Sequence, residues 1–138
     1  MKIRYVSDIK KLDWKSLNDF HKSCGWKGHG KRYWDTILKN AALYIAAFDG
    51  NKVVGKVRVF GDGLIWLIIV GLDVHKDYRK QGIAREMMNR IIRFAKKNKY
   101  QTVRLFAAID KDPNLKKFYE KMNYEPMDNA MRSKEMEW

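Results

Sequence analysis

The sequence predicts an α/β protein: one domain over residues 1–138, with helices on both faces of a mixed sheet. Three observations support this fold class. Strand-like segments separated by glycine-containing turns fill residues 41–74, which favours antiparallel neighbours. An amphipathic helical pattern then leads into another strand-like segment, and a crossover of this kind joins parallel strands. Helical patterns also precede the strands of residues 41–74.

The first forty residues predict a strand and two helices. Residues 2–6 alternate apolar and polar side chains, as a half-exposed strand does. A polar cap at residues 7–8 begins a helix in which apolar residues recur at roughly helical spacing, and Gly25 ends that helix. A second helix covers residues 31–40, with its aromatic and aliphatic side chains on one side.

Three strands are predicted next, over residues 41–48, 52–60 and 64–74. The second strand alternates valines with Lys52, Lys56 and Arg58, which is the period of a strand. The third strand is nearly all apolar. We therefore expect it to be central in the sheet and covered on both faces.

The helix after these strands has the clearest pattern in the chain. Its apolar stripe consists of Ala84, Met87, Met88, Ile91, Ile92 and Ala95. Asn98 ends this helix, and residues 102–108 form a strand parallel to the one at 64–74. A short helix is predicted at residues 115–122, and residues 131–138 are predicted to form a closing strand.

The charge balance is strongly basic. Lys and Arg number 29 against 16 Asp and Glu, a formal net charge of +13. Such a balance favours polyanionic partners, so nucleic acid stays open as a partner. A solvated basic surface that only aids solubility explains the same number equally well.

Several other classes of protein and site are not expected. Cys24 is the only cysteine, so no intrachain disulfide can form. The apolar runs are too short for a membrane span and no signal-peptide pattern is present, so we expect a cytoplasmic protein with no membrane partner. No grouping of His, Cys and carboxylates has metal-ligand spacing, and His21 and His29 are expected to be solvated. The sequence is compatible with a homodimer.

Residues 79–84, with the sequence Arg-Lys-Gln-Gly-Ile-Ala, form a candidate phosphate-binding turn. Small residues at Gly82 and Ala84 let the backbone approach a diphosphate. The first N–H groups of the following helix have no intrahelical acceptor and can donate to it. Arg79, Lys80 and Arg85 add positive charge. The alternative is a strand-to-helix turn in which Gly82 serves only sterics. A Walker phosphate loop and a three-glycine dinucleotide motif are both absent.

Two segments resemble motifs of the GNAT family, the acyl-coenzyme A-dependent N-acetyltransferases. Residues 72–84 are similar to the family's main cofactor motif. Residues 118–124, with the sequence Phe-Tyr-Glu-Lys-Met-Asn-Tyr, are similar to its later Phe-Tyr-Glu-Lys-x-Gly-Phe segment. The order of elements agrees along nearly the whole chain. The departures are Ala84 for the commoner Gly, Lys76 for a frequent Pro, and Asn123-Tyr124 for Gly-Phe.

The resemblance implies acetyl-coenzyme A as the cofactor, held in a cleft between the two parallel strands. The strand at Leu72 to Val74 would pair with the pantetheine arm, and the N–H groups of residues 80–85 would hold the pyrophosphate. The residues implied for cofactor binding are Leu72, Asp73, Val74, Arg79, Lys80, Gln81, Gly82, Ile83, Ala84, Arg85, Asn114, Phe118 and Lys121.

For catalysis, the resemblance implies Tyr119 as the general acid that protonates the leaving thiolate. The alternative for Tyr119 is a helix tyrosine packed half in the core. The general base is less defined, because Ile68 and Gly71 stand where many members have an acidic residue. Asp73 is the nearest carboxylate. Water, or loss of the amine's proton before binding, are the other options.

The predicted acceptor is a primary amine of a small molecule or peptide. Trp26, Tyr33 and Trp66 are the candidate substrate-binding residues, and ordinary core packing of the tryptophans is the other interpretation. Two alternative functions stay open. One is acetylation of an RNA-borne amine, as on a charged tRNA, and the other is a coenzyme A-binding module without catalysis.

Overall fold

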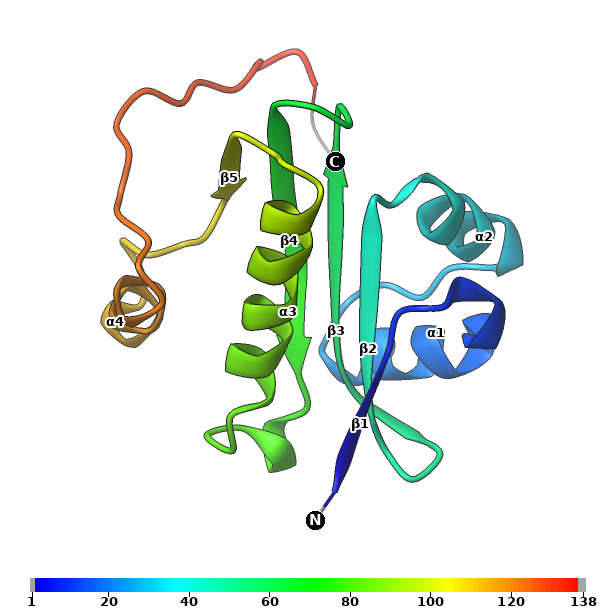
Figure 1. Cartoon of the computed structure of the whole chain (residues 1–138). Coiled ribbons are helices and arrows are strands. Elements are labelled where there is room, and N and C mark those ends of the chain that lie inside the picture. Colours follow the sequence, from blue (N-terminus) through cyan, green and yellow to red (C-terminus); the bar gives the residue numbers. More distant parts are fainter. Residues whose placement is uncertain (1, 137–138) are drawn as a thin grey trace. The chain divides into compact units, whose positions relative to one another are not determined.

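The computed structural model describes residues 2–136 and divides into two compact units, Met1–Phe106 and Ala107–Trp138. The first unit contains a five-stranded sheet with the order β1-β2-β3-β4-β5. Neighbouring strands are antiparallel from β1 to β4, and β4 and β5 are parallel (Figure 1). The strands are β1 (Ile3–Val6), β2 (Leu43–Asp49), β3 (Lys52–Gly61), β4 (Trp66–Val74) and β5 (Thr102–Leu105). The predicted mixed α/β architecture is confirmed, and the expectation of one domain over residues 1–138 stays a prediction.

The helices of the first unit are α1 (Trp14–Ser23), α2 (Lys31–Asn40) and α3 (Ile83–Lys97), with short 3₁₀ turns η1 (Ile9–Lys11) and η2 (Lys76–Tyr78). The prediction of one helix from residues 7–8 to Gly25 is wrong. Leu12 and Asp13 adopt extended backbone angles between η1 and α1. The Asp13 carboxylate accepts hydrogen bonds from the N–H groups of Lys15 and Ser16, and this local cap begins α1 there.

The sheet carries a separate apolar core on each face. On one face, buried residues of α1 and α2, such as Phe20 and Trp34, pack against Tyr44 and Ala46 of β2. On the other face, α3 packs on β2, β3 and β4 with Met87 and the rest of its buried stripe. Gly55 allows close packing there, because a Cβ at this position would lie 3.1 Å from Met87 Cε.

β4 is central in the sheet, as predicted, but the prediction that both its faces are covered is wrong. Leu67 and Ile69, on the α3 face, are buried. Ile68 and Val70 are only half-buried, and Trp66 is 43% exposed. The reason is that the core under α1 and α2 is formed with β2 and β3, so these helices leave the neighbouring part of β4 partly open.

The second unit contains α4 (Pro113–Lys121). Asp112 caps it by accepting from the N–H groups of Asn114 and Leu115, and Pro113 occupies its first turn. The predicted closing strand is wrong for residues 131–136, which form turn and irregular backbone, and its last two residues lie outside the described chain. The segment Arg132-Ser133-Lys134-Glu135 is continuously polar and lacks the apolar alternation of a half-buried strand.

Candidate functional site

The pairing between β4 and β5 stops halfway along β4. Its last register pair is Ile69 with Leu105, after which β5 ends while β4 continues to Val74. The predicted strand at residues 102–108 is therefore shorter than expected. From Val70 to Val74, β4 has no strand partner on its β5 side within the described part of the first unit. This open edge, residues 70–74, includes the predicted pantetheine segment.

A β-bulge lies at the start of the open edge. Arg58 pairs with Val70, whereas Lys56 pairs with Asp73, so β4 has one more residue than β3 between these pairs. Gly71 lies in the bulge with a φ of 66°, a left-handed conformation that glycine adopts without strain. The bulge therefore changes which backbone N–H and C=O groups of β4 point toward β3 in the last residues of the strand.

The backbone of Val74 points toward the open edge. His75 donates its N–H to the Val54 carbonyl at 2.8 Å. Because hydrogen-bonded and non-bonded pairs alternate along an antiparallel ladder, the next pair, Gly55 with Val74, is non-bonded. The N–H and C=O of Val74 are thus directed away from β3. The Arg79 guanidinium donates to the Val74 carbonyl at 3.2 Å, which fits this orientation.

The turn after β4 exposes unpaired backbone donors. Lys80 and Gly82 both have left-handed backbone angles, with φ of 61° and 84°. Gly82 is the N-cap of α3 and has no side chain to satisfy the N–H groups of the first turn. Glu86 donates the first intrahelical bond to the Gly82 carbonyl, so the N–H groups of residues 83–85 precede that ladder. Alternating backbone conformations of this kind form a concave anion-binding nest.

Side chains around the turn hold it in place and make it basic. Tyr78 donates its hydroxyl to Asp49 Oδ2 at 2.6 Å, which ties η2 to the end of β2. The His75 Nδ1 atom accepts from the N–H of Asp77 at 3.1 Å. The residues exposed on the turn include four cations, namely Lys76, Arg79, Lys80 and Arg85.

On the face that carries α1 and α2, Asp73 is the centre of a polar cluster. Lys56 Nζ lies 2.8 Å from Asp73 Oδ2, and the Trp26 indole N–H donates to Asp73 Oδ1 at 3.3 Å. Lys56 is only 5% exposed, although it alternates with valines along β3. The alternation along β3 is present, but Lys56 lies on the face of the sheet that carries α1 and α2, and it is covered there.

Aromatic rings surround this cluster. His21 lies edge-on to Trp34 at 5.3 Å and stacks near Trp26 at 6.2 Å. Burial, with a smaller contribution from the Lys56 charge, lowers the pKa of His21 to about 4, so its imidazole is neutral at pH 7. His29 stacks on Tyr33 at 3.7 Å. The expectation that both histidines are solvated is wrong for these packed rings.

The three predicted acceptor residues do not lie together. Trp26 and Tyr33 belong to the aromatic group beside α1 and α2. Trp66 begins β4, with the Arg104 guanidinium 4.7 Å from its ring, and Asp73 lies seven positions further along the strand. At about 3.3 Å per residue this is roughly 23 Å. A small substrate that touches Trp26 does not reach Trp66.

The residues predicted on the second motif all lie in the second unit. Asn114, Phe118, Tyr119 and Lys121 belong to α4, and the Phe118 and Tyr119 rings lie edge to face at 5.1 Å. The helix ends in a Schellman motif: Asn123 is left-handed at φ 70°, and the Tyr124 N–H donates to the Tyr119 carbonyl at 3.0 Å. Asn123 therefore replaces the family's Gly without loss of the turn.

Two kinds of feature are absent from the described residues. Within residues 2–136, no three His, Cys, Asp or Glu side chains are grouped so that they could hold a metal ion. Among the helices of the same residues, none is both long enough and apolar enough to cross a membrane.

The sheet is an antiparallel meander that ends in one parallel pair, and the glycine-capped α3 connects the two strands of that pair, a fold shared with solved acetyltransferase structures. The model of the acetyltransferase (GNAT) family matches residues 6–124, so the chain belongs to that family. It is 27% identical over 129 residues to "Uncharacterized N-acetyltransferase ycf52-like" of Prochlorococcus marinus, an alignment that covers 89% of this chain and 69% of the relative.

Solved structures share the fold. A probable acetyltransferase of unknown function from Staphylococcus aureus has a TM-score of 0.79 at 21% identity, covering 99% of this chain and all of the other. A GNAT family acetyltransferase from Streptococcus pneumoniae has a TM-score of 0.78 at 20% identity, with 96% and 99% coverage. AAC(6')-Iy, in complex with the bisubstrate analog CoA-S-monomethyl-acetylneamine, has a TM-score of 0.75 at 11% identity, with 97% and 98% coverage.

Proposed function

We propose that this chain transfers the acetyl group of acetyl-coenzyme A to a primary amine of a small molecule or peptide. The observation that carries the proposal is the open edge of β4, which runs directly into the turn at the N-terminus of α3. An extended pantetheine arm has amide groups that can pair with a free strand edge. The unpaired N–H groups of residues 83–85 and the cations of the turn suit a pyrophosphate.

The reaction we propose is a direct displacement. When bound, acetyl-coenzyme A supplies an activated thioester carbonyl. The neutral amine nitrogen would form a bond to the carbonyl carbon and lose one proton to water, the carbon–sulfur bond would break, and the sulfur would take a proton. The Val74 N–H, directed at the open edge, would donate to the carbonyl oxygen as negative charge develops there. Tyr119 would donate the proton to sulfur and regain one from solvent, an assignment that follows from the family resemblance.

The hydrogen bonds of Asp73 indicate whether this carboxylate can act as the general base. Both of its carboxylate oxygens already accept hydrogen bonds, from Lys56 and Trp26. A carboxylate held in this way is poorly placed to take a proton from an incoming ammonium ion. This supports water as the base, or an amine that is neutral before it binds.

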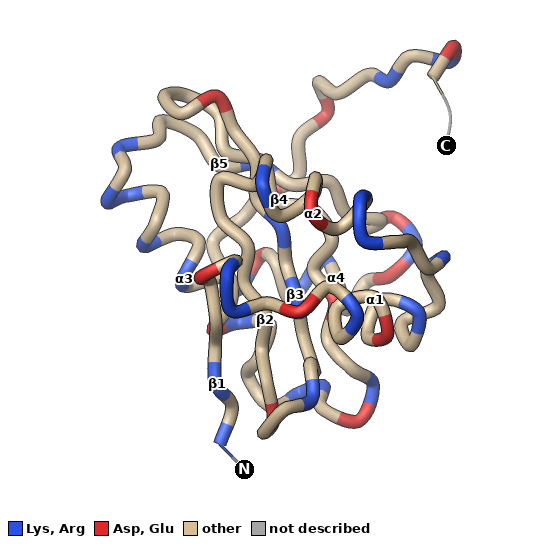
Figure 2. Tube along the Cα trace, turned by 90° about the vertical axis from the view of Figure 1, so that its right-hand side faces the viewer, with Lys and Arg blue, Asp and Glu red and all other residues tan. Residues whose placement is uncertain are grey.

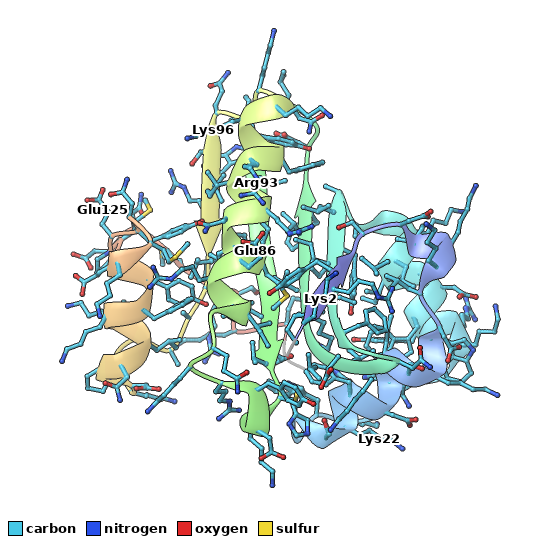
Figure 3. The ribbon with its side chains drawn as sticks, turned by 60° about the horizontal axis from the view of Figure 1, so that its bottom comes forward. Lys2, Lys22, Glu86, Arg93, Lys96 and Glu125 are labelled. Atoms are coloured by element: carbon cyan, nitrogen blue, oxygen red, sulfur yellow. The ribbon has the colours of Figure 1, made fainter. Side chains whose placement is uncertain are left out.

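The distribution of charge favours a small amine over an RNA-borne one. Residues 1–106 hold 23 of the 29 Lys and Arg and 9 of the 16 Asp and Glu, so the first unit carries the whole excess. Cations recur along α3, on the sheet face opposite the Asp73 cluster, as well as on α1 and α2 (Figure 2). Figure 3 shows Glu86, Arg93 and Lys96 along α3, where Glu86 accepts from Arg93 at 3.2 Å. Charge dispersed over both faces does not single out the acceptor side.

The test is release of coenzyme A thiol from acetyl-coenzyme A across a panel of polyamines, amino acids, aminoglycosides, peptides and charged tRNA. We expect amine-dependent release with at least one small amine or peptide, together with its N-acetylated product. Turnover with charged tRNA alone would replace the proposed acceptor class. Binding of coenzyme A with no release against any amine would identify a binding module and overturn the proposed reaction.

A further inference from the structure

We propose that Lys56 is a positioning residue: through Asp73, its buried ammonium fixes the bulge that turns the end of β4 toward the cofactor. The inference rests on the proposed function, because it assigns what orients the strand edge that acetyl-coenzyme A would use. Lys56 belongs to β3 and lies outside the two segments, residues 72–84 and 118–124, that resemble GNAT motifs.

Burial makes the pairing of Lys56 with Asp73 obligatory. Lys56 is the only polar or charged residue among the described ones that is classed as buried, and its side chain is 7% exposed against 16% for Asp73. A buried ammonium without a counter-ion is strongly disfavoured, as is a carboxylate left alone in the same place. The 2.8 Å contact between Lys56 Nζ and Asp73 Oδ2 therefore restrains the side chain of each.

The pairing register of β3 and β4 places the Lys56–Asp73 ion pair next to the bulge. Lys56 and Asp73 are directly opposite each other on adjacent strands, and the bulge lies between their pair and the pair of Arg58 with Val70. A Cβ built on Gly71 would lie 4.0 Å from Lys56 Nζ, so the ammonium lies next to the bulge itself. The ion pair thus ties down the first residue pair after the bulge. Val74, the next residue of β4, takes its orientation from that point.

The same carboxylate connects the acceptor side to the cofactor side. Asp73 Oδ1 accepts from the Trp26 indole at 3.3 Å, and Trp26 lies in the loop between α1 and α2. Lys56 contacts one oxygen of Asp73, and Trp26 of the loop contacts the other. A change at Lys56 is therefore expected to alter cofactor binding first, and acceptor binding through Trp26 second.

The test measures the dissociation constant of coenzyme A by calorimetry. Lys56→Met should weaken binding at least tenfold, whereas Lys56→Arg, which keeps the charge, should stay within threefold of the wild type. In an Asp73→Leu background, Lys56→Met should add no further loss, because Lys56 acts through Asp73. The matched control is Val59→Ala. Val59 is a fully buried β3 residue on the α3 face, and its truncation destabilises the sheet without touching the pair.

Each outcome decides the inference. A folded Lys56→Met protein that binds coenzyme A as the wild type does would overturn it. So would a Lys56→Met change that weakens binding as much in the Asp73→Leu background as in the wild type. A loss of affinity in Val59→Ala equal to that in Lys56→Met would also overturn it. If Lys56→Met does not fold, the doubly apolar Lys56→Met, Asp73→Leu protein decides, and wild-type affinity there overturns the inference. A wild-type protein that does not bind coenzyme A overturns the proposed function itself, and this inference with it.

Discussion

Tyr119 is the side chain on which the proposed acid step depends. It lies on α4, three residues before the Met122 cap of that helix, and its ring is 6.0 Å from that of Tyr124. Tyr119→Phe keeps the ring and removes only the hydroxyl proton. We expect turnover to fall by about 10²-fold, the usual loss for general acid catalysis, with the affinity for coenzyme A unchanged.

Steady-state kinetics and calorimetry on the same preparation check this expectation. Tyr124→Phe is the matched control, because it removes a hydroxyl from the neighbouring ring, and it should leave turnover within threefold of the wild type. Full activity in Tyr119→Phe would show that another group, or water, protonates the thiolate.

His21 makes stability depend on pH. Burial lowers its pKa from the ordinary 6.5 to about 4 in the folded protein, so between these values the unfolded chain binds more protons than the folded one. The free energy of unfolding should therefore be unaffected by His21 above about pH 6.5. It should decrease as the pH falls from 6.5 toward 4. Denaturant titrations across this range should show a weaker decrease for His21→Gln. Parallel pH profiles for the two proteins would show that His21 is solvated after all.

At the scale of elements, α1 depends on a cap that the apolar pattern does not reveal. The Asp13 carboxylate accepts from the Lys15 and Ser16 N–H groups and from the Ser16 hydroxyl. Asp13→Ala should lower the free energy of unfolding by about 1 kcal/mol, the usual value of an N-cap. Asp35→Ala, which removes an exposed pair with Lys31, should cost less than about 0.5 kcal/mol. Equal losses in chemical denaturation would show that the Asp13 cap contributes nothing specific.

Local patterns were sufficient for most elements of the first unit. The α2 boundaries were predicted correctly at residues 31–40, and the Gly82 cap and the α3 stripe also follow from short-range signals. The α1 boundary was not, because Leu12 continues the helical spacing while its backbone is extended. Propensity and periodicity do not register a break that a single Asp13 side chain produces.

The Asp73 cluster depends on information that no single segment contains. The alternation of β3 separates Lys56 from the valines, but it does not say that α1 and α2 pack over the side of Lys56. The pairing with Asp73 further requires the one-residue offset at Gly71, which arises only when β3 and β4 come together. Sequence reasoning therefore found the carboxylate and missed the ammonium that holds it.

At the scale of the whole molecule, the excess of positive charge makes a prediction about salt. The cations of the turn should contribute to coenzyme A binding as screened, exposed charges, so affinity should fall as the ionic strength rises. Calorimetry between about 50 and 200 mM salt should give a moderate decrease, far from the ~10³-fold or greater loss that many phosphate contacts with nucleic acid produce. Salt-independent binding would mean that the turn does not contact the pyrophosphate.

The proposed function depends on where acetyl-coenzyme A binds. The most direct measurement is a titration of the ¹⁵N-labelled protein with coenzyme A, followed by backbone amide chemical shifts. The largest saturable changes should fall on Leu72, Val74 and residues 82–85, with the amides of β1 unaffected. Changes confined to residues outside the open edge and the turn would contradict the account, as would the absence of any saturable change.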